Sequence, residues 1–167
     1  TGNTFTAGAI DLTVDSVQHY NGMVCVSNGD GYVWAPEANV TLDGNNQPVL
    51  GEYDVAAYNL ANPFKYPRAG TACNGTWTAT DLGAQTFWNF TDVKPGDEGE
   101  NTISLHIDSN PAWACIDVNL TANDDVTCND PENAAEGVGV CNTDGAPLFD
   151  GELAQNLKFA AWADDGD

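Results

Sequence analysis

The stretch Asn101-Thr-Ile-Ser-Leu-His-Ile-Asp108 alternates polar and apolar residues along its length. Ile103, Leu105 and Ile107 share one side of an extended chain, because successive side chains in a strand point to opposite faces. Two other stretches repeat the pattern, Ile10-Asp-Leu-Thr-Val-Asp15 and Ile116-Asp-Val-Asn-Leu-Thr121. A two-residue period carried by β-branched residues predicts half-buried strands. The fold is therefore expected to be built from strands.

Shorter signals extend this prediction. Met23–Val26 is continuously apolar, and Trp88–Phe90 and Lys158–Ala163 are expected to form two further strands. Clusters of Gly, Asn and Asp separate the strands, since these residues accept turn conformations at low cost. The turn clusters are Asn28–Gly31, Asp43–Asn46, Lys94–Asp97 and Asp144-Gly145.

Helical signals are few. Only Glu152–Leu157 indicates a helix, of one or two turns, while residues 36–72 and 121–151 show little periodicity and are expected to form long loops. The sequence has no internal repeat and no linker. We therefore predict an all-β fold in one domain, residues 1–167: a β-sandwich with Greek-key or jelly-roll wiring, long decorated loops and at most one or two short helices.

The charge balance excludes several partners. The 167 residues include 25 Asp and Glu against four Lys and Arg, a formal net charge of −21. Such a surface repels nucleic acid and anionic lipid, so neither is an expected partner. It suits cations or a solvent of high salt. No apolar run approaches the roughly 20 residues that a membrane span requires.

Five cysteines indicate an oxidising compartment, and with it secretion to the cell exterior. Thr1 is an unusual natural start, so an N-terminal export segment is expected to have been removed. Cys128 and Cys141 flank an irregular loop, where a disulfide would stabilise the fold by about 3 kcal/mol. Cys25 with Cys73 is the second pairing considered, which leaves Cys115 over.

Four glycosylation sequons agree with an extracellular location. Their asparagines are Asn39, Asn74, Asn89 and Asn119. The chain is rich in Asn and Thr, so unmodified surface asparagines are an equally weighted alternative.

Catalytic motifs are absent from the sequence. There is no HExxH, no GxSxG and no Gly-rich phosphate loop, and His106 falls on the outward side of its expected strand. We therefore predict no catalytic residue, no enzyme activity and no required cofactor. Asp164, Asp165 and Asp167 form an oxygen-rich terminal loop that suits a structural Ca²⁺, with a solvated acidic turn as the competing interpretation.

Two longer blocks carry a resemblance to a known family. They are Thr1-Gly-Asn-Thr-Phe-Thr-Ala-Gly-Ala-Ile-Asp-Leu-Thr-Val-Asp15 and Phe87-Trp-Asn-Phe-Thr-Asp-Val-Lys-Pro-Gly-Asp-Glu-Gly-Glu-Asn-Thr-Ile-Ser-Leu-His106. Asn110–Cys115 and Asp150–Asp167 follow in the same order. Together they resemble the TasA and camelysin family of biofilm-matrix fibre proteins, which is related to archaeal bundling pili.

The resemblance implies a jelly-roll subunit that polymerises with copies of itself by donor-strand complementation, and filaments that could bundle laterally. In physical terms an extended segment adds a strand to a sheet of the next subunit. The donor would lie within residues 1–14, with Phe5, Ile10, Leu12 and Val14 as anchors. The competing interpretation is that this strand pairs inside its own subunit.

Two other functions remain open. Camelysin-like relatives have been labelled metallopeptidases, although this sequence has no zinc-protease motif. A monomeric adhesin or carbohydrate-binding module on a sandwich is the third interpretation. It would need exposed aromatic platforms, whereas the five Trp are expected mainly in the core.

Overall fold

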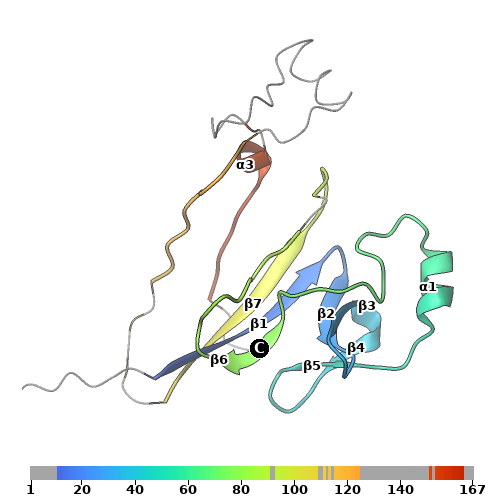
Figure 1. Ribbon diagram of the computed structural model, residues 1–167, viewed down its shortest axis with the longest axis horizontal. Coiled ribbons are helices and arrows are strands. Elements are labelled where there is room, and N and C mark those ends of the chain that lie inside the picture. The colour runs from blue at the N-terminus through green and yellow to red at the C-terminus, as the bar shows by residue number, and fades with distance from the viewer. Residues whose placement is uncertain are drawn as a thin grey trace, which may run out of the picture. The chain divides into compact units, whose positions relative to one another are not determined.

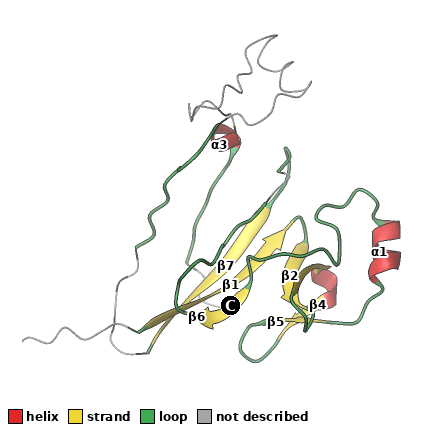
Figure 2. Cartoon of the chain, viewed as in Figure 1, coloured by secondary structure: helices red, strands yellow, loops and turns green. Residues whose placement is uncertain are grey.

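The computed structural model describes residues 11–90, 93–108, 111, 113, 115–124, 151 and 153–163. By its internal contacts the chain divides into two units, Thr1–Trp113 and Ala114–Asp167. Strands dominate the first unit, and the helices are short (Figure 2). The predicted all-β class is confirmed, and the described residues form only two short α-helices. The jelly-roll wiring and the single domain stay predictions.

A five-stranded antiparallel sheet organises the first unit (Figure 1). Its strands are β1 (Leu12–Tyr20), β2 (Met23–Ser27), β3 (Tyr32–Pro36), β6 (Trp77–Thr80) and β7 (Gly99–Ile107). β7 pairs with β1 along its whole length, from Leu12 opposite Ile107 to Tyr20 opposite Gly99. β2 and β6 therefore share the other edge of β1, β2 at the Tyr20 end and β6 near Val14 and Ser16.

The β1–β2 hairpin turns through Asn21 and Gly22, which both have positive φ, at 51° and 70°. An Asn-Gly pair suits this two-residue turn because both residues accept the left-handed region. This turn is not among the clusters predicted from the sequence. Asn21 also ties the turn to β7, since its backbone N–H donates to Glu98 O and its side-chain oxygen accepts from Glu98 N.

Residues 36–72 are more ordered than the loop expected there. They contain the 3-10 helix η1 (Glu37–Asn39), the hairpin of β4 (Val40–Leu42) and β5 (Pro48–Leu50), and the helix α1 (Val55–Ala61). Asp54 caps α1 by accepting a hydrogen bond from Ala57 N. Each element is too short to repeat its period, so a scan for periodicity does not detect it.

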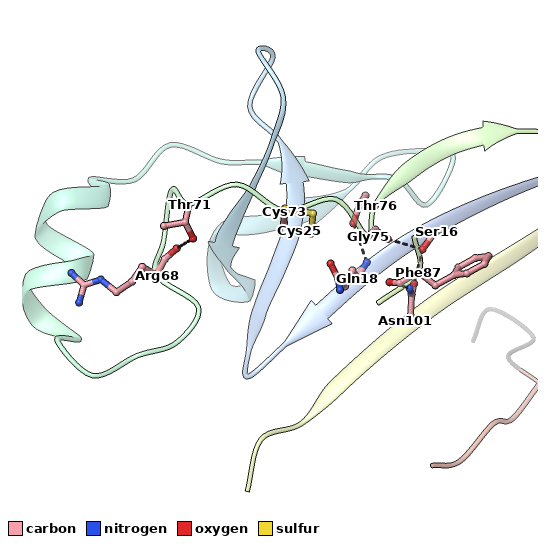
Figure 3. Close-up of a disulfide and its surroundings, with 10 residues drawn as sticks. All are labelled: Ser16, Gln18, Cys25, Arg68, Thr71, Cys73, Gly75, Thr76, Phe87 and Asn101. Atoms are coloured by element: carbon pink, nitrogen blue, oxygen red, sulfur yellow. Dashed lines mark hydrogen bonds between the residues drawn. A yellow bond between two sulfur atoms is a disulfide. The ribbon is translucent and has the colours of Figure 1, made fainter. Parts of the chain in front are cut away.

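The core of the first unit lies where β1, β2 and β3 meet the chain that follows α1. Its fully buried members are Tyr20, Met23, Cys25, Trp34 and Ala69. A disulfide joins Cys25 on β2 to Cys73 (Figure 3), which confirms that predicted pairing. Cys128 and Cys141 lie outside the described residues. Cys115 is exposed and forms no disulfide in the described part of the chain.

The second unit is described by residues 115–124, 151 and 153–163. Among these residues the helix α3 (Leu153–Asn156) confirms the predicted short helix. The strands expected at Ile116–Thr121 and Lys158–Ala163 are not formed, and Ile116, Val118 and Leu120 are 74%, 66% and 59% exposed. Alternation predicts which side chains share a face, but a strand also needs a neighbour to pair with. The strand expected at Trp88–Phe90 in the first unit is likewise absent.

Candidate functional site

The outer edge of β7 is the first feature with functional potential. β1 pairs with one edge of β7, and within the described residues no strand pairs with the other. An unpaired edge presents backbone N–H and C=O groups to any extended segment of another chain. β7 is nine residues long, which makes it one of the two longest described strands. The structure therefore offers a long edge for strand addition.

Apolar side chains beside this edge are exposed. We define the apolar stripe as Leu12, Ile103, Leu105 and Ile107, which are 39%, 37%, 47% and 38% exposed. Leu12 stands opposite Ile107, and all four lie on the same face of the sheet because opposed residues of antiparallel strands point the same way. The sequence predicted correctly that these side chains share a face, but it predicted wrongly that this face is buried. The alternation shows which side chains share a face, whereas their exposure depends on whether another layer covers that face.

The opposite face of β7 carries polar residues. Thr102, Ser104 and His106 point there, and His106 Nε2 lies 2.7 Å from Asp15 Oδ2. Asp15 is nearly buried, while His106 remains about half exposed. The imidazole thus serves as the partner of a buried carboxylate on the neighbouring strand.

A buried polar network fixes β1 and β7 relative to the chain that crosses them (Figure 3). Ser16 Oγ lies 2.7 Å from both Gly75 O and Asn101 Oδ1, and Asn101 Nδ2 donates to Phe87 O. Gln18 N donates to Thr76 Oγ1. Ser16 stands opposite Ile103, so the network lies on the same face as the apolar stripe, at its Ile103 end, and holds β1 and β7 there in one register.

The crossing chain lies very close to Gln18. A Cβ on Gly75 would lie 2.3 Å from Gln18 Cδ and 2.6 Å from Phe87 O, so only glycine fits there. The Gln18 side chain is fully buried, and its two amide atoms have no hydrogen-bond partner among the described residues. We have no physical account of this unpaired amide.

A second feature is a cavity of about 460 Å³ beside the disulfide, which we call the aromatic pocket. Tyr20 lines it, with Phe90 stacked on the Tyr20 ring at 4.2 Å between ring centroids and Tyr66 edge-on to the Tyr20 ring at 6.0 Å. Trp34 and Cys73 also line it. The polar residues that line it are Arg68, Thr71, Asn74 and Asn89, all exposed, and the Arg68 guanidinium donates to Pro63 O.

Asp97 holds one side of this aromatic group in place. Its carboxylate accepts hydrogen bonds from Tyr20 Oη (2.5 Å), Asn21 Nδ2 (2.9 Å) and Lys94 N (2.8 Å). The hydrogen bond from Tyr20 is the largest cause that lowers the pKa of Asp97, and the bonds from Lys94 N and Asn21 and the Lys94 charge add to it. Tyr53 differs, because burial raises the pKa of its phenol.

Asp97→Asn should destabilise the chain at pH 7 by about 1–2 kcal/mol, because an amide cannot accept all three hydrogen bonds. A lowered folded-state pKa means that ionised Asp97 stabilises the fold above its unfolded value of 3.8, and that this contribution is lost as the pH falls through the folded pKa. The difference between wild type and variant should therefore shrink below pH 3.8. Urea unfolding at pH 7 and at about pH 2.5 measures both values. Asp30→Asn, at an exposed turn residue, is the control; an equal loss in both variants would contradict the assignment.

The structure places the predicted polymerisation residues as follows. Leu12 and Val14 lie in β1 and pair with Ile107 and Leu105 of their own chain, and Val14 is buried. This arrangement is the one that the competing interpretation describes. Phe5 and Ile10 lie outside the described residues, so any donation by them stays a prediction.

Of the sequon asparagines, Asn74, Asn89 and Asn119 are exposed and Asn39 is partly exposed. Asn74 and Asn89 both line the aromatic pocket, a convergence that no local pattern in the sequence indicates. Thr76 of the Asn74 sequon is buried and accepts a hydrogen bond from Gln18 N. Glycosylation itself stays a prediction.

The predicted calcium ligands Asp164, Asp165 and Asp167 lie outside the described residues. Within the ranges that are described, no group of three or more His, Cys, Asp or Glu side chains is arranged to hold a metal ion. Among those same residues, no helix is both long and apolar enough to cross a membrane. His19 pairs with Glu37, with 3.2 Å between Nδ1 and Oε1.

None of the protein-family models, curated proteins or solved structures compared with the chain matches it.

Proposed function

We propose that this protein is the subunit of an extracellular filament and that the β7 edge accepts an extended segment from the neighbouring copy. The observation that carries the proposal is the coincidence of a long unpaired edge with exposed apolar side chains on one strand. Strand addition would satisfy the edge's backbone groups, and the apolar stripe would supply side-chain contacts. Such a contact joins two different surfaces, so it can repeat from copy to copy, and it builds an open filament when its rotation does not close a ring.

The expected energetics favour this mode of assembly. Complete burial of an aliphatic side chain stabilises by about 1.5–3 kcal/mol relative to full exposure. The stripe residues are already more than half buried, so each would add roughly 1 kcal/mol, and the new backbone hydrogen bonds add to this sum. The interface between two subunits would therefore be stabilised by the sum of many small contributions.

The donor in this proposal is the N-terminal segment before β1. Leu12 and Val14 already pair within their own chain, so the donated residues precede Leu12 and the anchors are Phe5 and Ile10. In the sequence, the donated residues therefore come directly before β1 of their own subunit. The resemblance to TasA-like fibre proteins motivates the choice of this segment. The Cys25–Cys73 disulfide is compatible with an extracellular setting.

The experiment is electron microscopy and sedimentation of the purified chain, compared with a donor variant. Phe5→Asp with Ile10→Asp should leave only monomers, because a charged side chain would have to give up water to pack against the apolar stripe. Asn45→Asp with Asn46→Asp adds the same charge at two exposed turn residues outside the donor and should still assemble. Monomers alone from the wild-type chain at high concentration would overturn the filament, and filaments from the Phe5 and Ile10 variant would overturn this donor.

A further inference from the structure

The loop that follows α1 presents a fully exposed phenylalanine. Phe64 is 97% exposed, although phenylalanine is one of the residue types most often buried in proteins. Leu60, near the end of α1, is 83% exposed. Side chains this exposed contribute little to the core of their own chain. Their apolar surface would be buried only against a partner.

Hydrogen bonds on both sides of Phe64 fix the shape of this loop. Asn59 in α1 pairs with Ala69, since Asn59 Nδ2 donates to Ala69 O at 3.0 Å and Asn59 Oδ1 accepts from Ala69 N at 3.2 Å. The Arg68 guanidinium donates to Pro63 O at 2.9 Å and points toward α1 (Figure 3). The loop is therefore preformed, and ordering it around a partner costs little entropy.

Two of the four Lys and Arg in the chain lie in this loop. We define residues 63–68 as the Phe64 knob, which contains Lys65 and Arg68 and no carboxylate. Neither cation forms an ion pair within the described residues, and the hydrogen bond from Arg68 to a carbonyl does not neutralise its charge. In a chain of net charge −21, a cationic knob with an exposed ring favours an acidic partner.

A shallow hollow before α1 has the complementary composition. Its volume is about 590 Å³, and the residues that line it are Leu50, Gly51, Glu52, Tyr53, Asp54 and Val55. Leu50, Tyr53 and Val55 supply apolar surface, and the carboxylates of Glu52 and Asp54 lie on exposed residues. Asp54 is the N-cap of α1, whereas the knob follows the C-cap Asn62. The knob and the hollow therefore lie at opposite ends of the same helix.

We propose that two copies of the chain pair through these surfaces, each placing its Phe64 knob in the hollow of the other. α1 has seven residues, so it is about 10 Å long. A two-fold axis that sets the two α1 helices antiparallel brings both knobs to both hollows at once. The cations of each knob then face the carboxylates of the other hollow, which makes the charges complementary. Such a contact is self-complementary and closes after two copies.

The dimer is expected to be weak. Two phenylalanine rings and a few ion pairs make a smaller interface than the roughly 1,200 Å² of stable complexes, so the Kd should be about 0.1–1 mM. In dilute solution the chain that carries Phe5→Asp with Ile10→Asp is therefore a monomer, as the filament experiment requires. The pairing uses no residue of β7 or of the apolar stripe, so it does not rest on the filament proposal.

Sedimentation equilibrium of the Phe5 and Ile10 double variant, at concentrations up to about 3 mM, measures the dimer. Adding Phe64→Ser should weaken it by at least about 100-fold, because two buried rings are lost in each dimer. Phe64 is almost fully exposed in the single chain, so this change should leave the fold intact. Trp113→Ser removes another fully exposed aromatic side chain outside the knob and is the matched control.

A charge reversal in the hollow tests the expected ion pairs. Glu52→Lys should weaken the dimer by about 10-fold, because it places like charges opposite each other. Asp30→Lys makes the same change in net charge at an exposed turn residue. Both variants lower the general repulsion between two acidic chains, so Asp30→Lys should leave the dimer unchanged or slightly tighter.

Photo-cross-linking identifies the surface that Phe64 contacts, whether or not the chains form filaments. The probe is p-benzoylphenylalanine in place of Phe64, which keeps the aromatic ring. With a mixture of isotope-labelled and unlabelled chains, mass spectrometry separates cross-links between copies from those within one chain. Cross-links between copies should join position 64 to residues 50–55.

Four results would overturn the proposal. They are the absence of a dimer up to about 3 mM, an undiminished dimer in Phe64→Ser, equal behaviour of Glu52→Lys and Asp30→Lys, and cross-links from position 64 to any other surface. Open-ended oligomers of the Phe5 and Ile10 variant whose cross-links join the knob to the hollow would contradict the two-fold arrangement. Cross-linking reports this contact in dimers and filaments alike, so its failure is distinguishable from failure of the filament proposal.

Discussion

Leu105→Glu is expected to abolish filament assembly while leaving the subunit folded. Leu105 is 47% exposed in the centre of the apolar stripe, so the isolated chain can keep a glutamate there in contact with water. A donated strand would cover that position and force the carboxylate out of water without a cation to pair with. Burying such a charge costs several kcal/mol, more than the roughly 1 kcal/mol that each stripe residue contributes.

Thr102→Glu is the matched control. Thr102 is exposed on the opposite face of the same strand, where it stands opposite Val17. The two variants have equal net charge and equal strand propensity at the substituted position, and differ only in the face they alter. Thr102→Glu should form filaments of wild-type length under electron microscopy, and thermal unfolding should show that both variants are folded.

Mixing experiments sharpen this test. Leu105→Glu chains keep an intact donor and should shorten wild-type filaments by capping one end. Combined with the Phe5 and Ile10 double variant, whose acceptor is intact, they should form dimers and no filaments. Filaments from Leu105→Glu alone would contradict the acceptor assignment, and so would equal loss of assembly in Thr102→Glu. A loss of several kcal/mol in monomer stability for Leu105→Glu would show that the stripe is covered within one chain.

Removal of the Cys25–Cys73 disulfide is expected to be the most destabilising change in the first unit. The bond closes a loop of 48 residues, which corresponds to about 4 kcal/mol in the chain-entropy model. Cys25 is fully buried, so Cys25→Ala with Cys73→Ala also leaves a small void in the core. For a domain whose total stability is about 5–15 kcal/mol, a loss of this size lowers Tm by roughly 8–16 °C.

Calorimetry of the double variant measures this effect. Cys115→Ser is the control, because Cys115 is exposed and outside the disulfide, and it should leave Tm unchanged. A decrease of less than about 1 kcal/mol would show that hydrogen bonds such as Cys73 N to Tyr32 O hold the segment without the disulfide.

The sequence by itself predicted three strands of the first unit, β1, β2 and β7, and it did not predict β3, β4, β5 and β6. Alternation placed Leu12 and Val14 in β1 and Ile103, Leu105 and Ile107 in β7, because a two-residue period is a local property of an extended chain. The α3 helix was also predicted, and the Cys25–Cys73 disulfide was the second of the two pairings considered. The hairpin turn at Asn21 and Gly22 could have been added from its residue types alone.

Only the tertiary structure decided what those strands present to a partner. Alternation groups Ile103, Leu105 and Ile107 on one face, but exposure depends on whether another layer covers that face, and no local pattern records this. The aromatic pocket has the same origin, since Tyr20, Arg68 and Phe90 meet through strand pairing and a disulfide between distant segments. Periodicity is a property of neighbouring residues, whereas a surface is made by residues that folding brings together.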